Sequence, residues 1–257
     1  MMRIFAISNQ KGGVGKTTTT VNLAASLSKK KKKVLLIDLD PQGNATSGSG
    51  IDKSKTTNSI YEALIGKYTL QKIIVTAKES AYDVAPANQA LAGAEIELVD
   101  IPEREYILKK QIKALNKSYD FILIDCPPAL NLLTVNALVA ADSVLIPMQC
   151  EYFALEGLSD LVNTIKRVKK HLNTEIQIEG LLRTLFDKRN TLAQQVSDQL
   201  SAHFGRKVYK TIIPRNVRLA EAPSHGKPVL LYDKKSKGAE AYLALADEIL
   251  RAQNNEK

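Results

Sequence analysis

Several residue types are scarce in this chain. It has no tryptophan, two cysteines and three histidines among 257 residues, and aromatic residues make up 5%. Cys126 and Cys150 are too few for the disulfide framework of a small secreted domain and have no CxxC spacing, so we expect reduced, partly buried thiols. His171, His203 and His225 have no spacing typical of a metal site or a catalytic relay, and we expect surface or packing residues.

Acidic residues are outnumbered by basic ones. The chain has 36 lysines and arginines against 27 aspartates and glutamates, which gives a net charge of +9. A surplus of positive charge attracts polyanions, so this composition favours a nucleic acid or an acidic membrane surface as partner. The sequence also lacks a signal peptide and any apolar run near the roughly 20 residues that a bilayer-spanning helix needs. We therefore expect a cytoplasmic protein.

Short apolar runs alternate with helical patterns along the chain. This alternation predicts βαβ units, and continuous apolar runs are typical of parallel strands buried on both faces. We therefore predict an α/β fold, with a doubly wound, mostly parallel sheet flanked by helices, in a single domain over residues 1–257. The predicted strands cover residues 4–8, 34–38, 121–125, 143–148 and 178–185.

Other segments are predicted from composition and helix signals. A helix starts near Gly15 and ends in the lysines of residues 29–33, where positive charge suits a helix C-terminus. Residues 43–57 are rich in Gly, Ser, Thr and Lys and predict a mobile surface loop. A last helix covers about residues 238–251 and fades into a polar tail over residues 253–257.

The stretch NQKGGVGKTT, residues 9–18, has the features of a phosphate-binding loop. Gly15, Lys16 and Thr17 fit the end of the P-loop pattern G-x-x-x-x-G-K-[ST], whereas its first glycine would fall at Gln10. Gly12 and Gly13 supply the backbone freedom instead. The loop follows a predicted strand and opens a helix, whose N-terminal amides attract phosphate. The pattern predicts nucleotide binding and leaves one lysine, Lys11, without a role.

Aspartates close two of the predicted strands. The run LLIDLDPQGN contains Asp38 and Asp40, and FILIDCPP contains Asp125. Ligands bind at the carboxyl ends of strands in open α/β sheets, so we expect these carboxylates near the phosphate site. An aspartate closing an apolar strand is a Walker B arrangement: Asp125 would hold Mg²⁺ directly or through water while Thr17 ligates it. Asp40 would orient or deprotonate the attacking water.

Five segments together resemble the ParA/Soj family of chromosome- and plasmid-partitioning ATPases. They are KGGVGKTT, LLIDLDPQGN, FILIDCPP, IPMQCEYFALEGL and PRNVRLAEAPSHGKP, and the resemblance spans nearly the whole chain. It implies an Mg²⁺-dependent ATP hydrolase with a deviant Walker A loop, slow unless stimulated by a partner. It also implies a role for Lys11, which in similar proteins reaches across an ATP-sandwich homodimer to the partner's phosphates.

The resemblance carries over a set of site residues. It implies Lys11, Lys16 and Asp40 as catalytic residues, and Thr17 and Asp125 at the metal. Pro214 and Asn216 match a segment that lies near the adenine in relatives. The residues implied to hold ATP are Lys11, Gly12, Gly13, Val14, Gly15, Lys16, Thr17, Thr18, Pro214 and Asn216.

Basic residues cluster in the second half of the chain, and surface lysines alone do not distinguish a DNA site from a solvated face. The resemblance implies sequence-independent binding of double-stranded DNA, with contributions from Arg189 and Arg218. It further implies a ParB-type partner bound at centromere-like sites and a nucleoid-associated location. The cluster consists of Lys188, Arg189, Arg206, Lys207, Lys210, Arg215, Arg218, Lys227, Lys234, Lys235 and Lys237.

Two alternatives stay open at this point. MinD-like ATPases share the variant loop and position themselves on membranes through an amphipathic C-terminal helix; residues 251–257 offer no bulky apolar anchor, so we expect no stable membrane anchor. A non-catalytic protein could use ATP only as a dimerisation switch, although Asp40 argues for hydrolysis. Whether the cargo is a chromosome or a plasmid does not follow from the residues.

Overall fold

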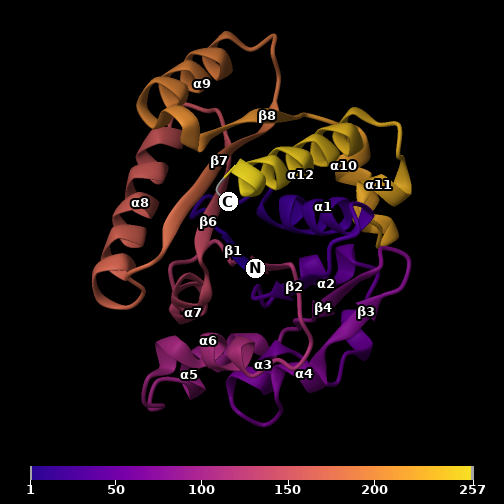
Figure 1. Cartoon of the computed structure of the whole chain (residues 1–257), viewed down its shortest axis with the longest axis vertical. Coiled ribbons are helices and arrows are strands. Elements are labelled where there is room, and N and C mark those ends of the chain that lie inside the picture. Colours follow the sequence, from indigo (N-terminus) through magenta and orange to yellow (C-terminus); the bar gives the residue numbers. More distant parts are fainter. Residues whose placement is uncertain (1, 256–257) are drawn as a thin grey trace.

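The computed structural model describes residues 2–255 and is built on one eight-stranded sheet with the strand order β3-β4-β2-β5-β1-β6-β7-β8 (Figure 1). Strand β3 is an antiparallel edge strand, and every other pairing is parallel. The strands are β1 Arg3–Ile7, β2 Val34–Asp38, β3 Val75–Ala77, β4 Tyr82–Ala85, β5 Phe121–Asp125, β6 Ser143–Gln149, β7 Gln177–Phe186 and β8 Val208–Pro214. The predicted doubly wound sheet is confirmed.

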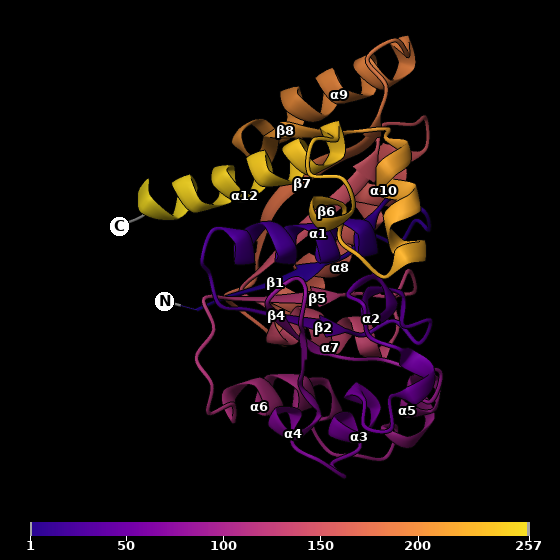
Figure 2. The same cartoon turned by 90° about the vertical axis from the view of Figure 1, so that its right-hand side faces the viewer.

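Helices cover both faces of this sheet. The α-helices are α1 Lys16–Lys29, α2 Asn44–Gly48, α3 Ile60–Leu64, α4 Leu70–Ile73, α5 Leu91–Glu97, α6 Ile107–Lys113, α7 Leu132–Ala140, α8 Ala154–His171, α9 Thr191–Phe204, α10 Val217–Glu221, α11 Val229–Tyr232 and α12 Lys237–Asn255. Short 3₁₀ turns η1 to η4 cover Lys53–Lys55, Arg104–Tyr106, Gly205–Lys207 and Ala222–His225. Figure 2 shows α1 and α12 on one side of the strands and α3, α4 and α6 on the other.

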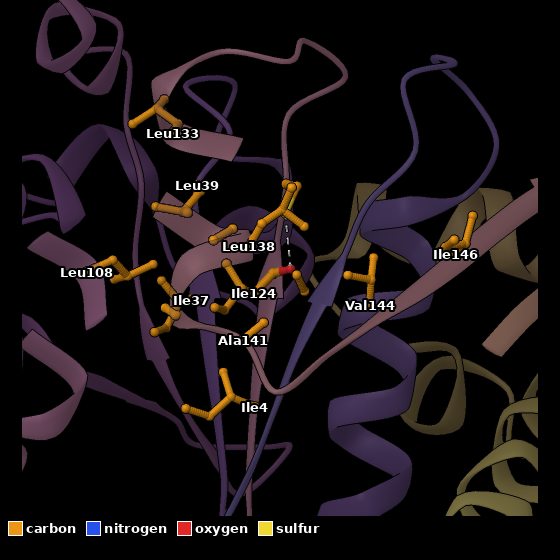
Figure 3. Packing of buried hydrophobic residues seen from close by; sticks show 14 of the residues in the cluster. Ile4, Ile37, Leu39, Leu108, Ile124, Leu133, Leu138, Ala141, Val144 and Ile146 are labelled. Atoms are coloured by element: carbon orange, nitrogen blue, oxygen red, sulfur yellow. Dashed lines mark hydrogen bonds between the residues drawn. The ribbon is translucent and has the colours of Figure 1, made fainter. Parts of the chain in front are cut away.

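The two faces of the sheet bury separate hydrophobic clusters, because successive strand residues point to opposite sides. On β5, Ile122 and Ile124 join the cluster beneath α3 to α9, whereas Phe121 and Leu123 join the cluster beneath α1 and α12. Figure 3 shows the first cluster, in which Ile124 lies among residues of β2, α6 and α7. Burial on both faces explains why these strands read as unbroken apolar runs in the sequence.

The predicted loop over residues 43–57 is wrong in part. The structure forms α2 and η1 within it, and Ala45 and Thr46 are fully buried. The segment begins at Gly43, whose φ of 61° and an added Cβ's 2.8 Å approach to the Ala87 carbonyl require glycine. Burial of small side chains, rather than a long apolar stripe, holds α2 in place, and this left little trace in the sequence pattern.

The ends of the other elements that were predicted differ little from prediction. The C-terminal helix α12 continues to Asn255 instead of fading near Arg251, while Glu256 and Lys257 of the expected polar tail lie outside the described residues. It lies alongside α1 (Figure 1), where the Tyr242 hydroxyl is 3.1 Å from Thr19 Oγ1. Cys126 and Cys150 are free and buried, as expected.

Candidate nucleotide-binding site

The phosphate-binding loop connects β1 to α1 at the carboxyl edge of the sheet. Gly13 and Gly15 have φ angles of 74° and 86°, a left-handed conformation that residues with a Cβ rarely adopt. Gly15 stands directly before the first turn of α1, so the turn aims the free amides of the helix N-terminus into the loop. The local sequence therefore builds a concave set of N–H donors suited to an anion.

The two lysines of the loop differ in their surroundings. Lys16 is buried, and its Nζ donates to the carbonyl oxygen of Lys11 at 3.0 Å. Burial lowers the pKa of Lys16, and the nearby Asp125 carboxylate opposes that shift. Lys11 lies at the rim with 43% of its side chain exposed and forms an ion pair with Glu151, which is equally exposed. Lys16 is therefore enclosed by the loop, whereas the Lys11 side chain points to the surface.

Asp125, at the end of β5, meets two threonines of α1. Its carboxylate accepts hydrogen bonds from Thr17 Oγ1 and Thr20 Oγ1, each at 2.8 Å. Burial raises the pKa of Asp125, and the charge of Asp38 on the neighbouring strand adds to the rise. A hydroxyl and a carboxylate 2.8 Å apart offer the hard oxygen ligands that Mg²⁺ takes, so the pair fits the predicted metal role.

Asp38 and Asp40 take different positions although they are two residues apart. Asp38 is fully buried and accepts from the backbone N–H and the hydroxyl of Thr46, at 2.8 and 2.7 Å, which ties α2 to the end of β2. Burial raises the pKa of Asp38. Asp40 instead lines the open cavity. Asp38 is thus committed to holding the loop, and Asp40 is the carboxylate free to face a ligand.

A cavity of about 630 Å³ is lined by Lys16, Thr17 and Asp40, whereas Lys11 and Asp125 are not among its lining residues. Most of the predicted nucleotide residues line it, Asn216 among them, but Pro214 lies in the wall of a neighbouring depression while Ile213 and Arg215 line the cavity. Val14 is buried beneath the loop. The lining residues are Gly12, Gly13, Gly15, Lys16, Thr17, Thr18, Asp40, Asn44, Pro128, Thr184, Leu185, Ile213, Arg215, Asn216, Val217, Leu219, Ala220 and Tyr242.

Thr184 and Tyr242 are among the residues of this wall that the sequence analysis did not predict. Thr184 Oγ1 donates to the Val14 carbonyl at 2.7 Å and so braces the phosphate loop from the end of β7. Tyr242 reaches the cavity from α12. A polar residue near the end of the apolar run 178–185 was a usable signal for Thr184. The Tyr242 position had none, because only the tertiary fold brings α12 beside α1.

Three or more His, Cys, Asp or Glu side chains do not gather into a metal centre anywhere in residues 2–255. Mg²⁺ is usually held by fewer protein groups than such a centre has, through one or two protein oxygens together with water and substrate phosphates. The three histidines are exposed, as expected, and His225 stacks on Tyr232 at 4.8 Å between ring centroids.

The family model described as "AAA domain" matches residues 2–178 of the chain. The sporulation initiation inhibitor protein Soj of Bacillus subtilis is 57% identical over 249 residues, which cover 97% of this chain and 98% of that protein. The chromosome partitioning protein ParA of Caulobacter vibrioides is 49% identical over 99% of this chain and 96% of its own length. The chain belongs to the ParA/Soj family of chromosome-partitioning ATPases.

Solved structures extend the comparison of this ParA/Soj chain. A Mycobacterium smegmatis protein titled cobyrinic acid a,c-diamide synthase, with bound ADP and magnesium, aligns with a TM-score of 0.88 and 37% identity over 100% of this chain and 97% of its own. The septum site-determining protein MinD of Pyrococcus horikoshii, complexed with Mg-ADP, aligns at 0.79 with 27% identity over 97% and 96%. These two proteins share this chain's fold and carry different names, so the function of this chain has to be argued from the residues of its nucleotide site.

Except for Arg215, the clustered basic residues in the C-terminal half of this ParA/Soj chain lie outside the nucleotide cavity. Arg189, which follows β7, is 91% exposed and pairs with Asp187 at 2.8 Å. Arg218, on α10, is 51% exposed and pairs with Glu221 at 2.8 Å. Both predicted DNA-contacting arginines therefore lie at the surface, each already held by a carboxylate of its own chain. No helix in the described part of the chain is long and apolar enough to span a bilayer.

Proposed function

We propose that residues 1–257 act as one Mg²⁺-dependent ATPase domain whose ATP-bound homodimer binds double-stranded DNA without sequence preference and drives DNA partitioning. Membership of the ParA/Soj family supports the partitioning role. The observation that carries the proposal is the contrast between Lys16, buried in the phosphate loop, and Lys11, exposed at its rim. One lysine serves its own chain's nucleotide, and the other is available to a second chain.

Each residue of the nucleotide site has a role in this proposal. The backbone amides of residues 12–18 and the Lys16 ammonium bind the phosphates, and Asn216 borders the base. Thr17 and Asp125 would hold Mg²⁺, which when bound neutralises phosphate charge and orients the phosphates. Asp40 orients the attacking water and accepts its proton. Asp38 keeps Asp40 in position, since it accepts the Asp40 backbone N–H at 3.1 Å.

The exposed segment that contacts Lys11 supports pairing with a second copy. Tyr152 and Phe153 follow Glu151, the partner of Lys11, and stay 74% and 67% exposed with their rings stacked edge to face. Large exposed aromatics are uncommon on a surface that faces only water and are enriched at interfaces. In the proposed dimer, each Lys11 leaves Glu151 and reaches the other subunit's phosphates. The triphosphate thereby stabilises the dimer by mass action.

Sequence-independent DNA binding fits the charges of the C-terminal half. Contacts to phosphates need arginine and lysine at the surface and no base-specific geometry. Arg189 and Arg218 exchange a carboxylate for a DNA phosphate, an exchange of low cost because exposed ion pairs contribute little to stability. Hydrolysis, stimulated by a ParB-type partner, returns the dimer to monomers and releases the DNA. The protein therefore works in the cytoplasm, on the nucleoid.

The test is retention of the purified chain on non-specific duplex DNA with ATP or ADP across a salt series. We expect strong retention with ATP that falls steeply with salt through counterion release, and weak retention with ADP. Equal retention with both nucleotides would contradict the DNA cycle. Retention on anionic liposomes in place of DNA would favour a MinD-like positioning ATPase instead.

A further inference from the structure

A second depression lies beside the nucleotide cavity, with a volume of about 920 Å³. Its wall carries five basic side chains and two acidic ones, Asp187 and Glu240. The basic residues come from the segment that follows β7, from strand β8 and the loop after it, and from the first residue of α12. They are Lys188, Arg189, Lys210, Arg215 and Lys237. Such a concave, mostly positive surface suits a phosphate backbone.

The depression and the nucleotide cavity share part of their walls. Arg215 and Val217 line both. A chain of contacts also runs from one to the other along the end of β7. Thr184 holds the Val14 carbonyl of the phosphate loop at 2.7 Å, and Phe186 accepts the backbone N–H of Arg215 at 3.1 Å. The phosphate loop and Arg215 are therefore attached to the same strand end.

Between these two contacts stands Leu185, which has a φ of 50°. A left-handed conformation at a bulky residue costs free energy and persists where its surroundings impose it. Thr184 before it and Phe186 after it are both fixed by the hydrogen bonds just described. The strand end is thus a constrained connection between the two cavities, not a free loop.

Arg215 differs from the other two arginines in its pairing. Arg189 and Arg218 each form an ion pair with a carboxylate of their own chain. Arg215 is exposed and forms no ion pair within the part of the chain that the structure describes. Its guanidinium is available to an added phosphate without first losing an internal partner.

We propose that Arg215 couples the two sites: it belongs to the wall that a bound nucleotide contacts and donates its guanidinium to a DNA phosphate in the basic depression. The proposal rests on the DNA-binding function proposed above. ATP in the cavity packs against the shared wall and restricts Arg215, so less conformational freedom is lost when DNA binds. Coupling of this kind is reciprocal, and DNA must raise the affinity for ATP by the same factor.

The experiment compares Arg215→Ala with two other charge removals. Lys237→Ala removes a basic residue of the depression that does not line the nucleotide cavity, and Lys113→Ala removes an exposed charge on α6 that lines neither. DNA affinity is measured by fluorescence anisotropy in ATP, in ADP and without nucleotide, and ATP affinity by titration with and without DNA. Light scattering checks that all three variants form dimers with ATP.

We expect Arg215→Ala to lower the ratio of DNA affinities with ATP and without nucleotide about tenfold, and to weaken ATP binding about threefold in the absence of DNA. Lys237→Ala should weaken DNA binding with and without ATP and keep the ratio, and Lys113→Ala should keep the DNA affinity, the ratio and the ATP affinity. A wild-type ratio, or wild-type ATP affinity, in Arg215→Ala overturns the proposal, as does loss of its dimers. A wild-type protein that binds DNA equally in ATP and ADP contradicts the DNA cycle itself, so the two failures are distinguishable.

Discussion

The nucleotide edge and the basic C-terminal surface are built on opposite physical principles. At the nucleotide edge, Asp125 and Asp38 are buried and each is satisfied by threonine hydroxyls at 2.7 to 2.8 Å. On the basic surface, Arg189 and Arg218 are exposed, and each can exchange its carboxylate partner for another anion. The first region acts through fixed geometry and the second through summed charge. Mutations should therefore have large, site-specific effects in the first region and graded, salt-dependent effects in the second.

The largest effect is expected for Asp40→Ala. Loss of a carboxylate that positions and deprotonates water lowers the hydrolysis rate by about 10²- to 10⁴-fold. ATP binding should persist because Asp40 does not hold the phosphate loop. Single-turnover phosphate release measures the rate, and Asp160→Ala on the exposed side of α8 is the matched control. Unchanged turnover in Asp40→Ala would remove this residue from the mechanism.

Lys11→Ala tests the rim where one chain would meet another. We expect ATP affinity to fall only slightly and ATP-dependent dimerisation to weaken by more than about tenfold, since a charge-assisted contact across the interface is lost. Multi-angle light scattering measures the dimer fraction. Glu151→Gln, which removes the partner of Lys11 within the same chain, should leave the dimers intact. Normal dimers in Lys11→Ala would show that this lysine does not act across subunits.

Changing both Arg189 and Arg218 to Ala tests whether DNA affinity depends on the summed charge of the basic surface. Each lost phosphate contact reduces the magnitude of the slope of log affinity against log salt by about 0.9. The loss of two contacts should therefore reduce that magnitude by roughly 2 for each monomer of the dimer. DNA affinity near physiological salt should fall about tenfold, and ATPase activity without DNA should not change. Anisotropy at four salt concentrations gives the slope. A double change to Ala at Lys29 and Lys33, exposed at the opposite edge of the sheet, controls for net charge; an equal loss there would mean that the location of the charges is unimportant.

The smallest effect is expected for Thr184→Val, which keeps the shape of the side chain and removes its hydrogen bond to the Val14 carbonyl. A buried acceptor left unsatisfied costs about 1 to 3 kcal/mol of unfolding free energy. Nucleotide affinity should fall a few-fold because the phosphate loop is braced less firmly. Urea denaturation measures the unfolding free energy and ATP titration measures the nucleotide affinity, with Thr174→Val at an exposed position as control. Stability at the wild-type level would mean that the brace contributes little.

The difference between the two regions also explains what the sequence predicts well. Strands β2 and β5 begin and end at the predicted residues, because burial on both faces leaves an unbroken apolar run that stops at an aspartate. The phosphate loop was predicted from the spacing of its glycines and Lys16, and Asp40 and Asp125 were predicted from their positions at or just after the ends of apolar strands. These features are local in the chain, so a single stretch of sequence contains the information.

Features that depend on distant contacts were not predicted. The short helix α2 is held by Thr46 bonded to Asp38, so the Gly- and Ser-rich segment 43–57 looked like a loop. Antiparallel β3 has only three residues. Thr184 and Tyr242 join the cavity from β7 and α12, and Pro214 lines the neighbouring depression although Ile213 and Arg215 on either side of it line the cavity. Pairing of Arg189 and Arg218 with acidic neighbours is likewise a property of the fold.

Helix α12 has a consequence for how the protein is made. It packs along α1, the helix that carries Lys16 and Thr17, and its Tyr242 contributes to the cavity wall and meets Thr19. A ribosome delivers residues in order, and the first part of a chain can begin to fold before the rest exists. The phosphate loop is therefore translated among the first residues, but the wall of the nucleotide cavity is completed only after nearly the whole chain has emerged. Nascent chains that still lack α12 should not compete with finished molecules for ATP.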